Sequence, residues 1–358
     1  MFLKILIVIV TFRAESMIND KLNLRILEKI CSGEGVTINV NFISKKLKKH
    51  RNTINGYVKE LFEHNIIMPP YYPFLEMFNQ RQLFAVVRAD LPKNELVENF
   101  TRNDENIFAA FRAWDEGYNT LLFEFHQDMS TYFEWKEKIV KEGKLPHLEH
   151  RFPADVLFLN NKLLIKYEPN SSLFYLEKMF KDMGELKLNG YSFSELSFSI
   201  MKMLLLGEGI KTNENNLARS LNTHRRTIEK RINAMSEAGI VSKPVCRFPH
   251  FLVPPESILV FSMVRINNNK EKIIKYIKED PHIPMAFQGH TGMYNLLYFN
   301  SFEKFRDHFI WEERLHEKFS DDSFGAMKKI YLWPEITGTI DPTKVILGVI
   351  RNKMNEIK

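Results

Sequence analysis

Apolar residues recur at helical spacing near the start of the chain, and the same arrangement returns further along. Residues 22–70 align without a gap on residues 196–244, at a constant offset of 174, and fifteen of these 49 pairs are identical. Beyond them a second block repeats at an offset of 176, where Phe123 matches Phe299. This period is far too long for a solenoid, so we interpret the chain as two copies of a two-part unit.

The first part of each copy has the pattern of three short helices. The first helix ends near a Gly-Glu-Gly turn, a short second helix follows, and the third begins near His50 or His224, where a polar N-cap is usual. The third helix carries apolar residues at i, i+4 and i+7, which predicts a stripe that packs on the first two helices. These stripes are Ile54, Val58 and Leu61 in one copy and Ile228, Ile232 and Met235 in the other. The pattern is typical of a helix-turn-helix domain.

The second part of each copy alternates strands with helices. In the first copy we expect strands at 83–89, 107–113, 120–126 and 155–160, with helices at 93–101 and around Phe133. In the second copy we expect strands at 258–266, 284–289, 294–299 and 327–333, with helices at 269–279 and around Phe309. The order β-α-β-β-α-β is the ferredoxin-like arrangement. An extra strand is expected after each copy, at 163–167 and 345–350, and a bridging helix at 171–186.

These patterns predict an α+β fold of two repeats, each an all-α, winged or plain helix-turn-helix domain followed by a ferredoxin-like βαββαβ domain. The predicted divisions are an unassigned N-terminal extension (1–17), helix-turn-helix 1 (18–70), sensing domain 1 (71–170), a helical linker (171–190), helix-turn-helix 2 (191–245) and sensing domain 2 (246–358).

The positive charge of the chain is concentrated in the helix-turn-helix segments. The net charge is +6. Residues 18–70 hold nine Lys or Arg against five Asp or Glu, and residues 191–244 hold eight against five. The rest of the chain therefore carries a net charge of −1. This distribution is the electrostatic footprint expected of two polyanion-binding modules on nearly neutral partners.

The outer face of each third helix supplies the candidate contacts to double-stranded DNA. Its residue types reach phosphates and base edges in the major groove, and the basic run before the first copy's third helix suits backbone phosphates. The candidates for phosphate contact are Lys45, Lys48, Lys49, Arg51 and Arg225, and those facing bases are Asn52, Asn55, Lys59, Arg226, Glu229, Lys230 and Asn233.

With these two parts in each copy, the chain resembles the Lrp/AsnC family of feast-or-famine transcriptional regulators. The phrase LARSLNTHRRTIEKRINAMSEAGIV at 217–241 resembles that family's helix-turn-helix, and GHTGMYNLLYF at 289–299 resembles the strand-turn-strand of its effector-sensing domain. The resemblance covers nearly the whole chain from about residue 18. It implies a covalent pseudo-dimer that regulates transcription, with homo-oligomers formed through the ferredoxin-like domains.

The resemblance also implies a small-molecule effector, such as an amino acid, at the strand-turn-strand. The corresponding residues are Gly117, Tyr118 and Asn119 in the first copy and Gly292, Tyr294 and Asn295 in the second. Asn119 and Asn295 replace the family's usual Asp. Gly and Asn are also what any tight turn favours, so a purely structural role stays open.

We find no nucleophile elbow, Walker loop or dinucleotide fingerprint, and we predict no catalytic activity, cofactor or metal. An alternative is an enzyme resembling siroheme decarboxylases, which reuse the same two-part unit. That resemblance implies His and Arg clusters that bind the carboxylates of a tetrapyrrole. The candidates on the relevant strands are sparse: Arg112, His126, Gln288 and His290. A scaffold that acts through protein contacts is a third alternative, which the charge distribution disfavours.

The ends and the cysteines bear on localisation. Residues 1–12 form an apolar run that is too short to span a bilayer. Translation from Met17, a buried extra strand and a secretory signal all remain open, and the first is favoured. Two cysteines, Cys31 and Cys246, give neither a disulfide framework nor a zinc motif. We predict a cytoplasmic protein with no membrane partner.

Overall fold

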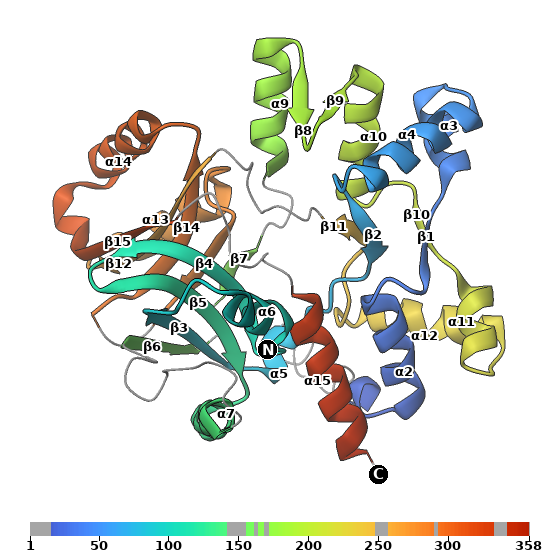
Figure 1. Cartoon of the computed structure of the whole chain (residues 1–358), viewed down its shortest axis with the longest axis horizontal. Helices are drawn as coiled ribbons and strands as arrows, with labels where there is room; N and C mark the ends of the chain where they lie inside the picture. The colour runs from blue at the N-terminus through green and yellow to red at the C-terminus, as the bar shows by residue number, and fades with distance from the viewer. Residues whose placement is uncertain are drawn as a thin grey trace, which may run out of the picture. The chain divides into compact units, whose positions relative to one another are not determined.

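The computed structural model describes residues 16–141, 155–160, 164–167, 172–247, 257–289, 293–332 and 342–357. The chain divides into two compact units, each assembled from both copies of the repeat. Unit 1 comprises residues 1–80, 180–249 and 342–358, and unit 2 comprises residues 81–179 and 250–341. Figure 1 labels the elements of both. The N-terminal extension lies almost wholly outside the described residues.

Unit 1 contains the two helix-turn-helix segments and the C-terminal helix. From the first copy it takes α2 (Lys21–Cys31), β1 (Val36–Ile38), α3 (Val40–Leu47), α4 (Arg51–Glu63), β2 (Met68–Tyr71) and α5 (Met77–Gln80). From the second copy it takes β8 (Leu186–Leu188), β9 (Tyr191–Phe193), α10 (Glu195–Leu205), β10 (Ile210–Thr212), α11 (Glu214–Ser220), α12 (Arg225–Glu237) and β11 (Val245–Arg247), and it ends with α15 (Thr343–Glu356).

The two copies exchange their first helices. Strands β1 and β10 pair antiparallel and lead each first helix across to the other copy. As a result α2 packs against α12, and α10 packs against α4 (Figure 1). Arg231 of α12 accordingly donates to Asp20 at 2.7 Å and to Asn23 at 2.6 Å, both at the start of α2. We call the assembly of α3, α4 and α10 head A, and that of α11, α12 and α2 head B.

This exchange corrects the prediction that each third helix packs on the first helix of its own copy. The apolar stripes were identified correctly, since Ile54, Val58, Leu61, Ile228, Ile232 and Met235 are all buried. Their partner was not, because the two first helices present similar apolar faces and the pattern cannot tell one from the other. The predicted caps are confirmed: His50 Nδ1 accepts from the Asn52 N–H, and His224 Nδ1 from the Arg226 N–H, each at 3.2 Å.

Unit 2 is built on one nine-stranded sheet in the order β6-β3-β5-β4-β15-β12-β14-β13-β7. The first copy supplies β3 (Leu83–Ala89), α6 (Glu95–Asn103), β4 (Ile107–Asp115), β5 (Tyr118–His126), α7 (Met129–Lys141), β6 (Asp155–Asn160) and β7 (Leu164–Tyr167). The second supplies β12 (Ile258–Ile266), α13 (Lys270–Glu279), β13 (Met285–Gln288), β14 (Leu296–Phe302), α14 (Phe305–Phe319), a 3-10 turn (Asp321–Ser323) and β15 (Phe324–Leu332). Helix α9 (Ser172–Met183) follows β7 and spans the division between the units in sequence.

The two halves of this sheet meet through a phenylalanine core. Phe84 of β3 stacks on Phe287 of β13 with ring centroids 4.3 Å apart, and Phe123 of β5 contacts Phe299 of β14 at 4.7 Å. Each such pair contributes about 0.5–1.5 kcal/mol beyond its buried area. The opposite faces are covered by α6 and α7 in one half and by α13 and α14 in the other. The α+β fold with two ferredoxin-like modules is thus confirmed.

The C-terminal segment differs from its prediction. The run Val345–Ile350, expected as a strand, belongs to helix α15, which packs on α2 and α5 in unit 1 rather than in the second module. Its buried face contains Val345, Ile346, Val349 and Ile350. β-branched residues favour strands in isolation, and packing on α2 overrides that preference. In the part of the chain that the structure describes, no helix is both long enough and apolar enough to cross a membrane.

Candidate functional site

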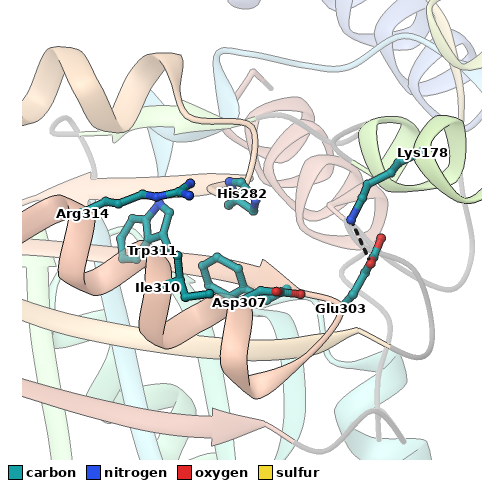
Figure 2. Close-up of a pocket in the computed structure, with 8 residues that line it drawn as sticks. Lys178, His282, Glu303, Asp307, Ile310, Trp311 and Arg314 are labelled. Atoms are coloured by element: carbon teal, nitrogen blue, oxygen red, sulfur yellow. Dashed lines mark hydrogen bonds and ion pairs between the residues drawn. The ribbon is translucent and has the colours of Figure 1, made fainter. Parts of the chain in front are cut away.

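A cavity of about 340 Å³ lies beside α14 in unit 2 (Figure 2). This volume is at the lower end of small-molecule sites, which span about 300–1,000 Å³. Its walls combine aromatic, cationic and acidic side chains, and Figure 2 shows Arg314 and His282 on one side with the Lys178–Glu303 pair on the other. The lining residues are Lys178, His282, Phe302, Glu303, Asp307, Ile310, Trp311 and Arg314.

Asp280 organises the histidine of this cavity. The carboxylate accepts from the backbone N–H of His282 at 2.8 Å and from Trp311 Nε1 at 2.6 Å, and it lies 2.9 Å from His282 Nδ1. Burial raises the pKa of Asp280, but the hydrogen bonds from His282 and Trp311 outweigh it and hold that pKa below its ordinary value. An ionised Asp280 therefore fixes the ring and directs Nε2 away from itself, as in an acid–base pair.

The remaining walls supply charge and a flat apolar surface. Phe302 stacks on His282 with ring centroids 5.0 Å apart and planes inclined by 21°. Lys178 of α9 forms an ion pair with Glu303 at 3.0 Å, and Arg314 lies one turn of α14 beyond Trp311. The cavity thus combines a guanidinium, an imidazole and an ammonium with two carboxylates and an aromatic wall. Arg314, whose guanidinium has no carboxylate partner among the described residues, and His282 are the groups that suit a carboxylate on an unsaturated ring.

The first module repeats the frame without the histidine. Asp104 accepts from the Asn106 N–H at 2.8 Å and from Trp135 Nε1 at 2.9 Å, as Asp280 does from His282 and Trp311. At the position of His282 stands Asn106, whose side-chain oxygen accepts from Arg81. Only the second module, among the described residues, therefore pairs this aspartate with a group that can transfer a proton.

Sequence reasoning missed this cavity, because its residues come from α9, the turn before β13, and α14. One signal was present: Asp104 and Trp135 match Asp280 and Trp311 at the same offset of 176. An aspartate and a tryptophan kept at fixed spacing in both copies indicate a hydrogen-bonded frame, in which the change from Asn106 to His282 is the informative difference.

The histidines and arginine considered earlier for a tetrapyrrole lie elsewhere. His126 is buried beneath α7, with Nε2 3.0 Å from Glu124 Oε2. Burial, and then the charge of Arg81, lower the pKa of His126 to about 3. Arg112 and Gln288 do not line the cavity, and His290 lies outside the described residues.

The strand-turn-strand residues have structural partners. Asn119 accepts from the Leu91 N–H at 3.0 Å and donates to the Leu91 carbonyl at 2.9 Å. Asn295 makes the same two bonds with Ile266, at 2.7 and 2.8 Å. Gly117 has φ +73° at the tip of its turn, and Arg88 lies over the Tyr118 ring. Tyr294 is partly buried, and Gly292 lies outside the described residues. An effector at these turns stays a prediction.

The candidate DNA-contacting residues are exposed on the two heads of unit 1. On head A these are Lys45, Lys48, Lys49, Arg51, Asn52, Asn55 and Lys59, and on head B they are Arg225, Arg226, Glu229, Lys230 and Asn233. Lys59 pairs with Glu63 at 3.3 Å, and Arg225 lies 3.9 Å from Glu214. Both pairs are solvent-exposed and contribute little stability, so the cations remain available to a polyanion.

Comparison with solved structures gives matches over nearly the whole chain. The crystal structure of the siroheme decarboxylase NirDL has a TM-score of 0.50 and 11% identity, and covers 94% of this chain and 99% of that chain. The same protein in complex with an iron-uroporphyrin III analogue gives 0.49 and 10%, with 95% and 100% covered. The AsnC structure from E. coli matches 37% of this chain and 86% of its own, with a TM-score of 0.27 and 16% identity. No protein-family model and no curated protein matches the chain.

The match corrects the prediction that the chain is not an enzyme. The duplicated two-part architecture is shared over nearly its full length with an enzyme, the siroheme decarboxylase NirDL, so the architecture gives no ground for that prediction. Absence of familiar catalytic motifs was a poor guide, because a site assembled from distant segments carries no local motif. At 11% identity the likeness shows the fold alone; activity has to be argued from the site.

Proposed function

We propose that this chain is a decarboxylase of a carboxylated tetrapyrrole, of the siroheme decarboxylase type. The single observation that carries the proposal is the Asp280–His282 pair beside Arg314 in an aromatic-walled cavity, in a fold shared over nearly its full length with NirDL. The cations and the Phe302–Trp311 wall match one carboxylate-bearing edge of such a substrate.

The proposed decarboxylation needs a proton donor and groups that orient the carboxylates, and the cavity offers both. The bond between the side-chain methylene and its carboxylate breaks, CO₂ leaves, and the electron pair that remains on the methylene takes up a proton. His282, held by Asp280, supplies that proton from Nε2. Arg314 and Lys178 orient the carboxylates, and the aromatic wall excludes water from the carboxylate that departs.

The test uses the purified full-length protein with siroheme. Mass spectrometry of the extracted pigment should show loss of CO₂, and His282→Asn should slow this by at least about 100-fold, the usual minimum for a general acid. His316→Asn is a matched control, since His316 pairs with Asp321 at 2.9 Å on the exposed end of α14 and outside the cavity. No conversion by the wild type, or equal loss in both variants, contradicts the proposal.

A second candidate function is binding of double-stranded DNA, favoured by the exposed cationic faces of heads A and B. Phosphate contacts from these faces would make the affinity fall steeply with salt. Arg226→Ala combined with Lys230→Ala should weaken retardation of duplex DNA on gels, because head B loses two cations while head A keeps its own. The control, Lys272→Ala with Lys275→Ala, removes the same charge from exposed positions on α13 and should change nothing.

A further inference from the structure

Gly56 stands in the middle of α4, on the exposed outer face of head A. A glycine inside a helix is destabilising relative to alanine. Its backbone does not have a positive φ, and a Cβ added there would meet nothing within 4 Å. Among the described residues nothing therefore requires this glycine, and the space it leaves is open to whatever approaches the helix from outside.

On this face Asn52 and Asn55, which precede Gly56, are short, whereas Lys59, one turn further along the helix, is long. Asn52 and Asn55 are both exposed, and neither extends far from the helix. The two short amides and the glycine let another backbone come close to the N-terminal half of α4. Asparagine recognises adenine by a bidentate pair of hydrogen bonds in the major groove.

Head B presents long side chains at the positions of Asn52, Asn55 and Gly56, and the short Asn233 at the position of Lys59. Arg226 and Lys230 replace Asn52 and Gly56, and both are exposed. Because His50 and His224 cap the two helices in the same way, these positions are directly comparable. Arginine and lysine reach guanine O6 and N7 from a greater distance.

We propose that the two heads read different half-sites, head A an adenine-containing one at close range and head B a guanine-containing one, so that the chain binds non-palindromic duplex DNA in a single orientation. This inference rests on the second proposed function. The observation that carries it is an exposed mid-helix glycine that follows two asparagines in head A, where head B has an arginine, a glutamate and a lysine at the equivalent positions.

The first experiment is selection of bound sequences from a random duplex pool with the full-length protein. The wild type should recover two dissimilar half-sites. Arg226→Asn combined with Lys230→Gly gives head B the short face of head A, and should turn the guanine half-site into a second adenine half-site. Identical half-sites from the wild type, or an unchanged guanine half-site from this variant, would overturn the inference.

The second experiment places a lysine at position 56, on the outer face of head A. Gly56→Lys should improve the helix and add positive charge, yet it should weaken binding to the selected site roughly 10-fold, because the longer side chain prevents close docking. Gly56→Ala should bind within a few-fold of the wild type. Tighter binding by Gly56→Lys, with the sequence preference unchanged, would contradict the role assigned to this glycine.

The two levels of failure are distinguishable. If no sequence is retained from the pool at low salt, DNA binding itself is wrong, and this inference falls with it. If DNA is retained but both half-sites are alike, the heads bind DNA and only the inferred division between them is wrong.

Discussion

In both α/β modules an aspartate accepts a hydrogen bond from a tryptophan of the covering helix and another from a backbone N–H two residues further on. In the first module that residue is Asn106, tied to Arg81, and the nearby charges are buried. In the second it is His282, beside an open cavity. One duplicated frame thus serves packing in the first module and, under the proposed function, chemistry in the second.

The two modules also differ on the strands beneath their covering helices. The first module buries Glu124 and His126 against each other, whereas the corresponding positions in the second are Asn300 and Phe302. Phe302 forms part of the cavity wall. Duplication within one chain therefore allows one module to keep a closed, polar interior while the other has an open cavity.

The largest expected effect falls on a feature that both copies share. Gly33 and Gly207 have φ of +89° and +78°, and a Cβ would lie 2.7 and 2.5 Å from the carbonyl oxygens of Pro70 and Pro244. Gly33→Ala or Gly207→Ala should each lower the free energy of unfolding by about 2–4 kcal/mol. Urea unfolding measures this, and the exposed Gly56→Ala should be neutral or stabilising. A tolerated alanine at either turn would mean that the two copies are not held in the same way.

The paired tryptophans separate structure from chemistry. Trp135→Phe and Trp311→Phe each remove one hydrogen bond to a carboxylate, and both should lower the free energy of unfolding by about 1.5–3 kcal/mol. Only Trp311→Phe should also shift the pH dependence of turnover, because Asp280 loses a bond that holds its pKa down. An equal kinetic effect of Trp135→Phe would place the chemistry in both modules.

The buried pair of the first module should leave a signature in the pH dependence of stability. Burial, and then Asp104, raise the pKa of Glu124 well above 4.5, and burial and Arg81 lower the pKa of His126 from 6.5 to about 3. The folded pair then holds one proton on Glu124. The unfolded chain holds one proton between pH 4.5 and 6.5, two below that window and none above it.

The stability contributed by this pair should therefore be level between pH 4.5 and 6.5 and fall on both sides of that window. Glu124→Asn combined with His126→Phe, which installs the second module's residues, should remove this dependence. Urea unfolding of wild type and variant across the pH range measures the difference. A difference that stays constant with pH would show that the pair is not neutral in the folded protein.

The helices and strands of the α/β modules could be predicted from the sequence, because alternation and amphipathic spacing are local properties. The exchange of α2 and α10 between copies could not be predicted from the sequence, since the apolar faces of these two helices are nearly interchangeable. The sequence pattern predicted a strand at Val345–Ile350, where packing on α2 makes this segment part of helix α15. The cavity could not be predicted from the sequence, because only the folded sheet and its helices bring Lys178, His282 and Arg314 together.

The most direct test of the central claim is the stoichiometry of siroheme binding, followed through the Soret band. One equivalent per chain is expected, with Arg314→Gln weakening binding at least about 10-fold, as loss of a charge-assisted carboxylate contact implies. Lys138→Gln, the corresponding position of the first module, should bind as the wild type does. Two equivalents per chain, or unchanged binding by Arg314→Gln, would contradict the assignment of the site to the second module.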